Sequence, residues 1–158
     1  MMTMETTALT GAGLTGVPGA AVEGRANIFE MTQAAEEAVL RPKDCGAWSH
    51  ELRAALAARI AVQNDEHALA ERYAAGAGGF APLAGPSQDG AAEGLAAVLA
   101  FMDKVAADTR NVASTDIAGL QAAGILDADI VRLCELNAFL AYQLRVVAGL
   151  RLMKGVFA

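Results

Sequence analysis

Apolar residues recur at helical spacing along most of the chain, and no segment shows the alternation of apolar and polar residues that is typical of a strand. A first helix is predicted from Ile28 to Leu40, because Pro42 forces the chain out of the helical conformation. A second helix is predicted from an N-cap at Ser49 to about Gln63. These patterns predict an all-α fold, a bundle of about six helices.

The pattern continues with a short, alanine-rich third helix, capped by Asn64 or Asp65, that ends in the glycine run at 76–79. Residues 76–90 are rich in Gly, Pro and Ser and are predicted to form a loop. The other three helices are expected at 95–105, from a cap at Ser114 or Thr115 to Gly124, and from about Ala128 to Met153 after Asp127. Apolar residues cover nearly the whole circumference of the last helix, which predicts a central, buried element.

The composition indicates one domain. The chain has 158 residues, and its 54% hydrophobic content is ample for a single core. Residues 1–25 have a small, turn-prone composition that predicts a flexible N-terminal leader, and 26–158 are assigned to the all-α domain. The start lacks the basic residues and compact apolar run of a secretory signal, so we expect a cytoplasmic protein.

Charge and apolar run length argue against two classes of partner. The net charge is −6 and the 12 Lys and Arg residues are scattered, whereas nucleic-acid binding needs a concentrated basic surface. Asn137, Gln143 and Arg145 interrupt the longest apolar run, so no membrane span is expected. Cys45 and Cys134 are far apart in the sequence and form no CxxC or zinc motif. We therefore expect no nucleic acid, no membrane and no metal or other cofactor.

The most densely polar stretch, residues 63–73, contains the first candidate catalytic residues, Glu66 and His67. His67 and Glu71 are four residues apart, which places them on one face of a helix where they could form an acid/base or metal pair. A stable metal site would need further ligands, and His50 is the only other histidine. The alternative interpretation, a solvated helix face, is the one we favour.

Asn137 and Arg145 lie on an apolar helix and would cost free energy if they were buried without partners. One interpretation is a structural network, in which Arg145 pairs with Glu51 or Glu66 and Asn137 satisfies a backbone group. The other is the polar floor of a small-molecule pocket, in which Arg145 binds an anionic substrate and Tyr73 or Glu66 faces it.

Two segments resemble the AhpD-like alkylhydroperoxidases and carboxymuconolactone decarboxylases (CMD family). Residues 116–131, followed by Asn137 and its neighbours, look like the closing helix pair of peroxidase-related members. Residues 51–73 are similar to the core helix of the family, which ends in Asn-Gly before a redox CxxC and a downstream His. The resemblance implies an AhpD-like all-α scaffold that forms homo-oligomers.

The resemblance places other residue types at each redox position. Asn64 matches the Asn of the family, but Glu66 falls on the first redox Cys and Leu69 on the second. The position of the downstream His becomes Tyr73, and that of the upstream proton-relaying Glu becomes Ala54. Peroxide reduction needs a thiolate and a resolving thiol, so the sequence predicts a variant member without dithiol peroxidase activity.

Three functions therefore remain open from the sequence. The chain could be a structural or partner-binding homo-oligomer, which we expect first. It could instead be a peroxidase-related or decarboxylase-type enzyme that uses Glu66, His67 or Tyr73, or a module that binds a small molecule through Arg145 and Asn137. The observation that separates them is whether Glu66, Tyr73 and Arg145 converge on one pocket.

Overall fold

The computed structural model describes residue 7 and residues 16–155, and within them every regular element is helical. The elements are α2 (Gly16–Gly24), α3 (Ala26–Leu40), α4 (His50–Gln63), α5 (His67–Ala74), the 3₁₀ helix η1 (Gly78–Ala84), α6 (Ala96–Ala107), the 3₁₀ helix η2 (Thr109–Asn111), α7 (Ser114–Ala122) and α8 (Asp127–Lys154). The predicted all-α class is confirmed. The described part holds seven α-helices, slightly more than the expected six.

Helix α4 is the centre of the packed core. All ten residues from Leu52 to Ala61 are buried, so the helix is covered on every side. Its many alanines let α5, η1, α6 and α8 approach closely. The helix begins as predicted, because the Ser49 hydroxyl accepts a hydrogen bond from the Leu52 N–H at 3.2 Å.

Two buried arginines of α4 hold the surrounding loops. Arg53 donates to three backbone carbonyls at the end of α3 and in the loop that follows it, at 2.8 to 3.0 Å. Arg59 donates to three carbonyls at the end of η1 and just after it, and forms a two-bond ion pair with Asp103 at 2.7 and 2.8 Å. Each buried guanidinium is thereby satisfied, so these charges are structural.

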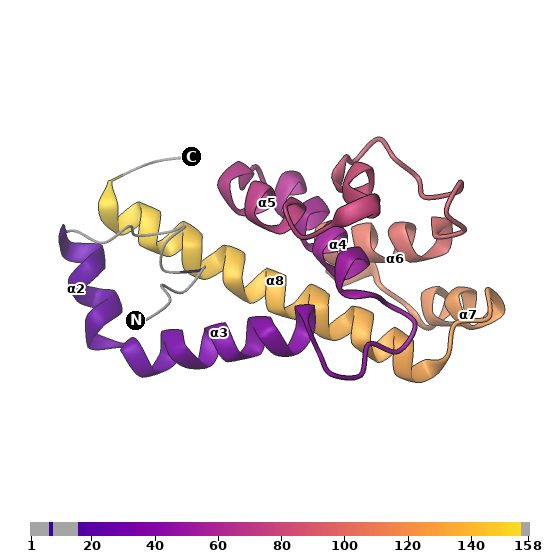
Figure 1. The fold of residues 1–158 in the computed structure, drawn as a ribbon, viewed down its shortest axis with the longest axis horizontal. Coiled ribbons are helices and arrows are strands. Elements are labelled where there is room, and N and C mark those ends of the chain that lie inside the picture. Colours follow the sequence, from indigo (N-terminus) through magenta and orange to yellow (C-terminus); the bar gives the residue numbers. More distant parts are fainter. Residues whose placement is uncertain (1–6, 8–15, 156–158) are drawn as a thin grey trace.

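Helix α8 runs the length of the molecule and joins two regions of different build (Figure 1). The region we call the body contains α4 to α7, η1, η2 and residues 127–140 of α8. The region we call the arm contains α2, α3 and residues 141–154 of α8. Helices α2 and α3 both pack on α8, and the arm extends away from the body along it.

Three elements form where none was predicted: α2 and the 3₁₀ helices η1 and η2. Helix α2 lies inside the segment assigned to the leader, and the rest of that leader, apart from Thr7 and Arg25, lies outside the described residues. The 3₁₀ helix η1 occupies part of the predicted loop at 76–90. Glycine and proline suggested a loop there, but a short 3₁₀ helix accommodates Pro82.

The predicted caps of α5 and α7 are each displaced by a residue or more. Glu66 is the N-cap of α5, in place of Asn64 or Asp65, because Asp65 adopts a left-handed conformation with φ of 58° and delays the helix. Ala113 precedes α7, one residue before the predicted cap at Ser114.

Candidate functional site

The polar stretch at 63–73 divides into a buried and an exposed side. Glu66 is 7% exposed, and Tyr73 lies with it among the buried residues. His67 and Glu71 are both exposed, as the interpretation of a solvated helix face predicts. No group of three or more potential metal ligands occurs among the residues that the structure describes.

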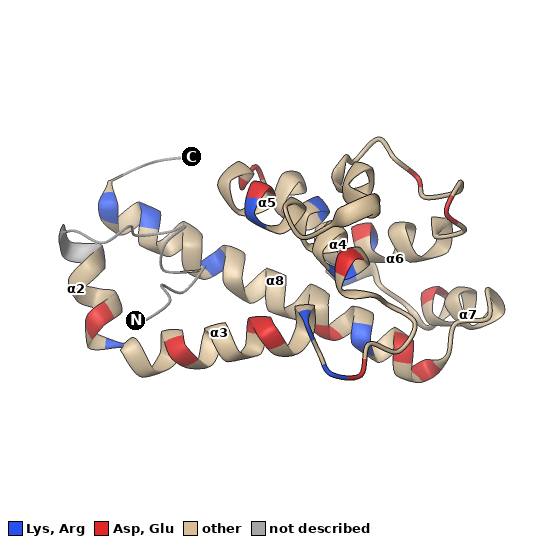
Figure 2. Cartoon of the chain, viewed as in Figure 1, with Lys and Arg blue, Asp and Glu red and all other residues tan. Residues whose placement is uncertain are grey.

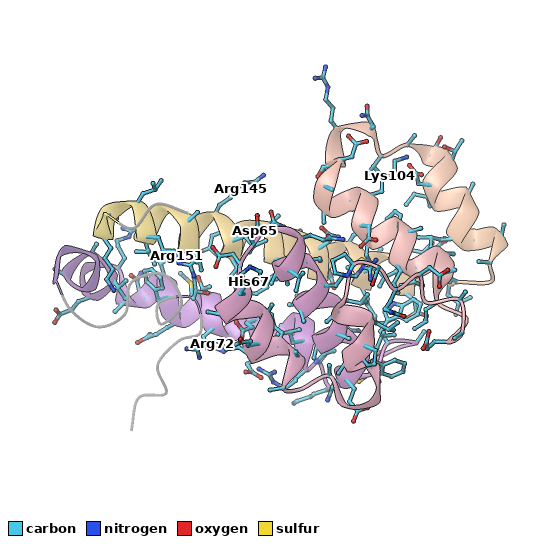
Figure 3. All side chains as sticks on the ribbon, turned by 90° about the horizontal axis from the view of Figure 1, so that it is seen from above. Asp65, His67, Arg72, Lys104, Arg145 and Arg151 are labelled. Carbon is cyan, nitrogen blue, oxygen red and sulfur yellow. The ribbon has the colours of Figure 1, made fainter. Side chains whose placement is uncertain are left out.

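Glu66 forms an ion pair with Arg151 of α8 through its Oε1 atom. Figure 3 shows Arg151 extending from α8 toward α5. The second carboxylate oxygen, Oε2, is buried and has no hydrogen-bond partner within the described part of the chain. A buried acceptor without a donor costs roughly 1–3 kcal/mol, so an unpartnered oxygen at this position requires an explanation.

Glu66 lines a pocket of about 310 Å³ between the turn from α4 to α5, the end of α6 and one stripe of α8. The residues that line it are Ile60, Asn64, Glu66, Ala106, Asn137, Ala141, Leu144, Arg145 and Ala148. Its walls are mainly aliphatic, with four polar side chains among them. This composition is typical of a small-molecule site, although the volume is at the lower end of the usual range of about 300–1,000 Å³.

Both asparagines of the pocket direct their amide N–H groups away to backbone carbonyls. Asn137 Nδ2 donates to Met102 O at 3.0 Å, and Asn64 Nδ2 donates to Ile60 O at 2.8 Å. The prediction that Asn137 satisfies a backbone group is confirmed. Only the amide nitrogen can donate, so these bonds fix the orientation of each amide and leave its oxygen as an acceptor.

Arg145 lies at the edge of the pocket. Its side chain is exposed and makes no hydrogen bond or ion pair within the described part of the chain. The predicted pairing of Arg145 with Glu51 or Glu66 is wrong, because Glu66 pairs with Arg151 instead. The two arginines are six residues apart, about 120° around the helix, and Figure 3 shows them leaving α8 in different directions.

Tyr73 belongs to a different, fully buried network. Its hydroxyl lies 2.5 Å from Gln143 Oε1 and 3.0 Å from Glu36 Oε2, and Gln143 Nε2 donates to the same Glu36 oxygen at 2.8 Å. The Gln143 amide also donates to the Thr7 hydroxyl at 3.1 Å. Burial, followed by the nearby Glu36 carboxylate, raises the pKa of Tyr73 above its ordinary value of 10.0. The network joins α3, α5 and α8.

Of Glu66, Tyr73 and Arg145, which were expected to converge on one pocket if the chain binds a small molecule, two share a pocket. Glu66 and Arg145 line it together with Asn137, whereas Tyr73 does not. His67 is exposed and is not among the pocket residues.

Sequence reasoning missed three participants: Glu36, Arg151 and the role of Gln143. A signal for Glu36 existed, because the buried residues of α3 fall at positions 29, 32, 36 and 40, and a carboxylate on that stripe is bound to be buried. Gln143 interrupts the apolar run of α8, which marked it as a polar residue that needs a partner.

Both cysteines are free thiols, and neither lines the pocket. Cys45 lies in the loop after α3, where its Sγ contacts the Pro42 carbonyl at 3.8 Å. Cys134 is on α8, where burial, with a further contribution from Glu135, raises the pKa of the thiol. A raised pKa lowers the thiolate fraction, which is the opposite of what a redox nucleophile needs.

The charged residues are spread over both regions (Figure 2). Three basic side chains, Arg145, Arg151 and Lys154, lie on the arm part of α8, and acidic residues predominate along α3. None of the described helices is long and apolar enough to span a membrane.

No protein-family model, curated protein or solved structure matches this chain. The AhpD-like resemblance therefore stays a prediction, and function is inferred from the geometry of the pocket.

Proposed function

We propose that this chain is a variant AhpD-like module that binds a small molecule in the pocket at Glu66 and Arg145 and has no dithiol peroxidase chemistry. One observation carries the proposal: the Glu66 carboxylate lines a pocket, and its Oε2 atom is buried without a hydrogen-bond partner among the described residues. A ligand with a hydrogen-bond donor would remove that deficit. The proposal covers binding and does not require turnover of the ligand.

The position of Glu66 supports the same conclusion. In the resemblance, Glu66 takes the place of the attacking Cys, and the pocket is built around this residue. A carboxylate cannot be oxidised to a sulfenic acid or resolved by a thiol, so binding or proton transfer is the chemistry that remains. A role for His67 or Tyr73 in that chemistry has less support, because one is exposed and the other is enclosed in a separate network.

NMR spectroscopy of the alanine methyl groups tests the binding. Ala106, Ala141 and Ala148 line the pocket, whereas Ala55 and Ala57 are fully buried in the body core. In a screen of small polar fragments, we expect saturable shifts confined to the first set, with the second set as internal control. If no fragment shifts the pocket methyls, the proposed function is wrong.

Peroxide consumption with a thiol reductant tests the proposal that the chain has no dithiol peroxidase chemistry. We expect no turnover by the wild type and none by Cys45→Ser or Cys134→Ser. Wild-type turnover that disappears in either variant would reveal a relocated thiol site and contradict the proposal.

A second function, assembly into a homo-oligomer, is favoured by the exposed apolar residues of the arm. Six large hydrophobic residues are exposed in the described part of the chain, and four of them belong to the arm: Met31, Tyr142, Leu152 and Met153. A second copy of the chain could cover this surface and would explain why the arm projects from the body.

Light scattering of a matched pair of variants tests this assembly. Leu152 of the arm and Leu126 of the body are 60% and 71% exposed. We expect Leu152→Asp to reduce the molar mass of an oligomer toward 16.2 kDa, and Leu126→Asp to leave it unchanged. A wild type that is monomeric at micromolar concentration would rule out the oligomer.

A further inference from the structure

The pocket at Glu66 is rich in acceptors on its inner side and has a cationic donor at its edge. Each asparagine amide donates to a backbone carbonyl and keeps its oxygen as an acceptor. Glu66 Oε2 adds a third acceptor, which has no partner among the described residues. Arg145 is the one described lining side chain with a positive charge. An occupant that complements this arrangement carries N–H donors at one end and an anionic group at the other.

The charges around the pocket restrict the occupant further. Arg145 and Arg151 carry two positive charges, and Glu66 and the adjacent exposed Asp65 carry two negative charges. The sum is zero, so an occupant without net charge leaves the site balanced. A simple anion or a simple amine would each leave one charge uncompensated near aliphatic walls.

Arg145 and Glu66 are positioned to bind opposite ends of one molecule. Within the described part of the chain no ion pair joins them, and Glu66 is held instead by Arg151, about 120° around α8 from Arg145. The pair with Arg151 uses Oε1 alone, which permits the carboxylate to turn Oε2 toward the pocket. The guanidinium of Arg145 can bind a carboxylate through two parallel hydrogen bonds.

We infer that the ligand of this pocket is a small zwitterionic amino acid. Its ammonium group donates to Glu66 Oε2 and to the amide oxygens of Asn64 and Asn137, and its carboxylate binds Arg145. This inference rests on the proposed function and adds the chemical class of the ligand. The aliphatic residues between the two ends contact the carbon chain of the ligand, so the best chain length is set by the distance between Glu66 and Arg145.

Calorimetry with ligands of matched carbon skeleton tests the inference on the wild-type protein. The probes are the ω-amino acids from glycine to 6-aminohexanoate, together with butanoate and butylamine as ligands that keep only one charged end. We expect one member of the series to bind about tenfold more tightly than either single-ended probe, because only the zwitterion satisfies both ends. Equal affinity for butanoate or butylamine would overturn the inference.

Two variants test which residue binds each end of the ligand, and a third serves as the control. Arg145→Gln should abolish the advantage of the amino acid over butylamine, and Glu66→Gln should abolish its advantage over butanoate. Arg72→Gln removes an exposed arginine of α5 that does not line the pocket and should change neither preference. Circular dichroism verifies that each variant is folded, and the comparison of probes on the wild type does not depend on any variant.

The NMR and calorimetry results together separate failure of the ligand class from failure of the proposed function. If other fragments shift the pocket methyl groups but no amino acid binds, the ligand class is refuted and the binding function stands. If no compound shifts these methyl groups, both are refuted.

Discussion

The body and the arm share helix α8 but are stabilised in different ways. Among the described residues, a continuous cluster of 25 buried residues surrounds α4 and includes Leu40 of the arm, while the arm has a satellite cluster in which only Phe29 and Leu150 are buried. Where the two regions meet, the arm adds the hydrogen-bonded network of Glu36, Tyr73 and Gln143. The body is therefore held mainly by apolar burial, and the arm depends more on polar contacts.

The pocket lies between these regions. Its walls from α4 and α6 belong to the body, and Arg145 and Ala148 belong to the arm. The pocket is therefore lined by residues of both regions, which differ in how they are packed.

The largest expected effect is a loss of unfolding free energy, and it is tested by comparing two leucines of α8. Leu140 is 0% exposed in the body cluster, and Leu150 is 7% exposed in the arm cluster. We expect Leu140→Ala to lower the free energy of unfolding by roughly 2–5 kcal/mol, because it leaves a cavity in a close-packed core. Leu150→Ala should cost about 1–2 kcal/mol, since fewer buried neighbours lose contact. Urea unfolding measures both, at a protein concentration below that of any association. Equal costs would show that the arm is packed as well as the body.

The second prediction concerns the polar network. Tyr73→Phe removes the hydroxyl between Glu36 and Gln143 and should cost about 1–3 kcal/mol, because two buried polar groups lose a partner. Tyr142→Phe is the control, since Tyr142 is 41% exposed and its hydroxyl hydrogen-bonds Thr32, at 2.9 Å. We expect that change to cost about 0.5 kcal/mol or less. A neutral Tyr73→Phe variant would show that the network does not stabilise the junction.

The raised pKa of Tyr73 adds a pH dependence with a definite sign. The folded protein holds the phenolic proton more tightly than the unfolded chain, whose tyrosines ionise near pH 10. The contribution of Tyr73 is therefore fully present below about pH 10 and is lost as the pH rises above it, by at most about 1.4 kcal/mol per pH unit. The difference in unfolding free energy between wild type and Tyr73→Phe, measured from about pH 9 to pH 11, isolates this group. A difference that grows with pH would contradict the direction of the shift.

The contrast between the regions also explains how far the sequence could predict the structure. Helical spacing and the Ser49 cap located α3 and α4. Helical spacing also located α8, but the prediction that this helix is the central, buried one is wrong, because only 10 of its 28 residues are buried and α4 occupies the centre. These are local signals, which depend on residues within a few turns. The 3₁₀ helix η1 was missed because glycine and proline suit both a loop and a short 3₁₀ helix.

The candidate site was predictable only in part, because its contacts join distant segments. Glu66 attracted attention in the most densely polar stretch, and Asn137 and Arg145 did so as polar residues on an apolar helix. The structure brings the three to one pocket. The partner of Glu66 is 85 residues away on α8, at Arg151, and helical spacing alone could not distinguish it from Arg145. The pairing follows from where the fold places the N-cap of α5 relative to α8, which is not a local property of the sequence.

The smallest expected effect is at His67, the residue that the sequence offered as an acid/base candidate. Its side chain is exposed on the first turn of α5, outside the pocket and beside a buried Glu66. We expect His67→Ala to change the free energy of unfolding by no more than about 0.5 kcal/mol and to leave pocket binding unchanged. Thermal or urea unfolding and the alanine methyl shifts provide the two measurements, with Glu66→Gln as the change in the adjacent residue that should weaken binding. A loss of ligand affinity in His67→Ala would mean that the ligand reaches the solvent face of α5, and that the inner side of the pocket is only part of the site.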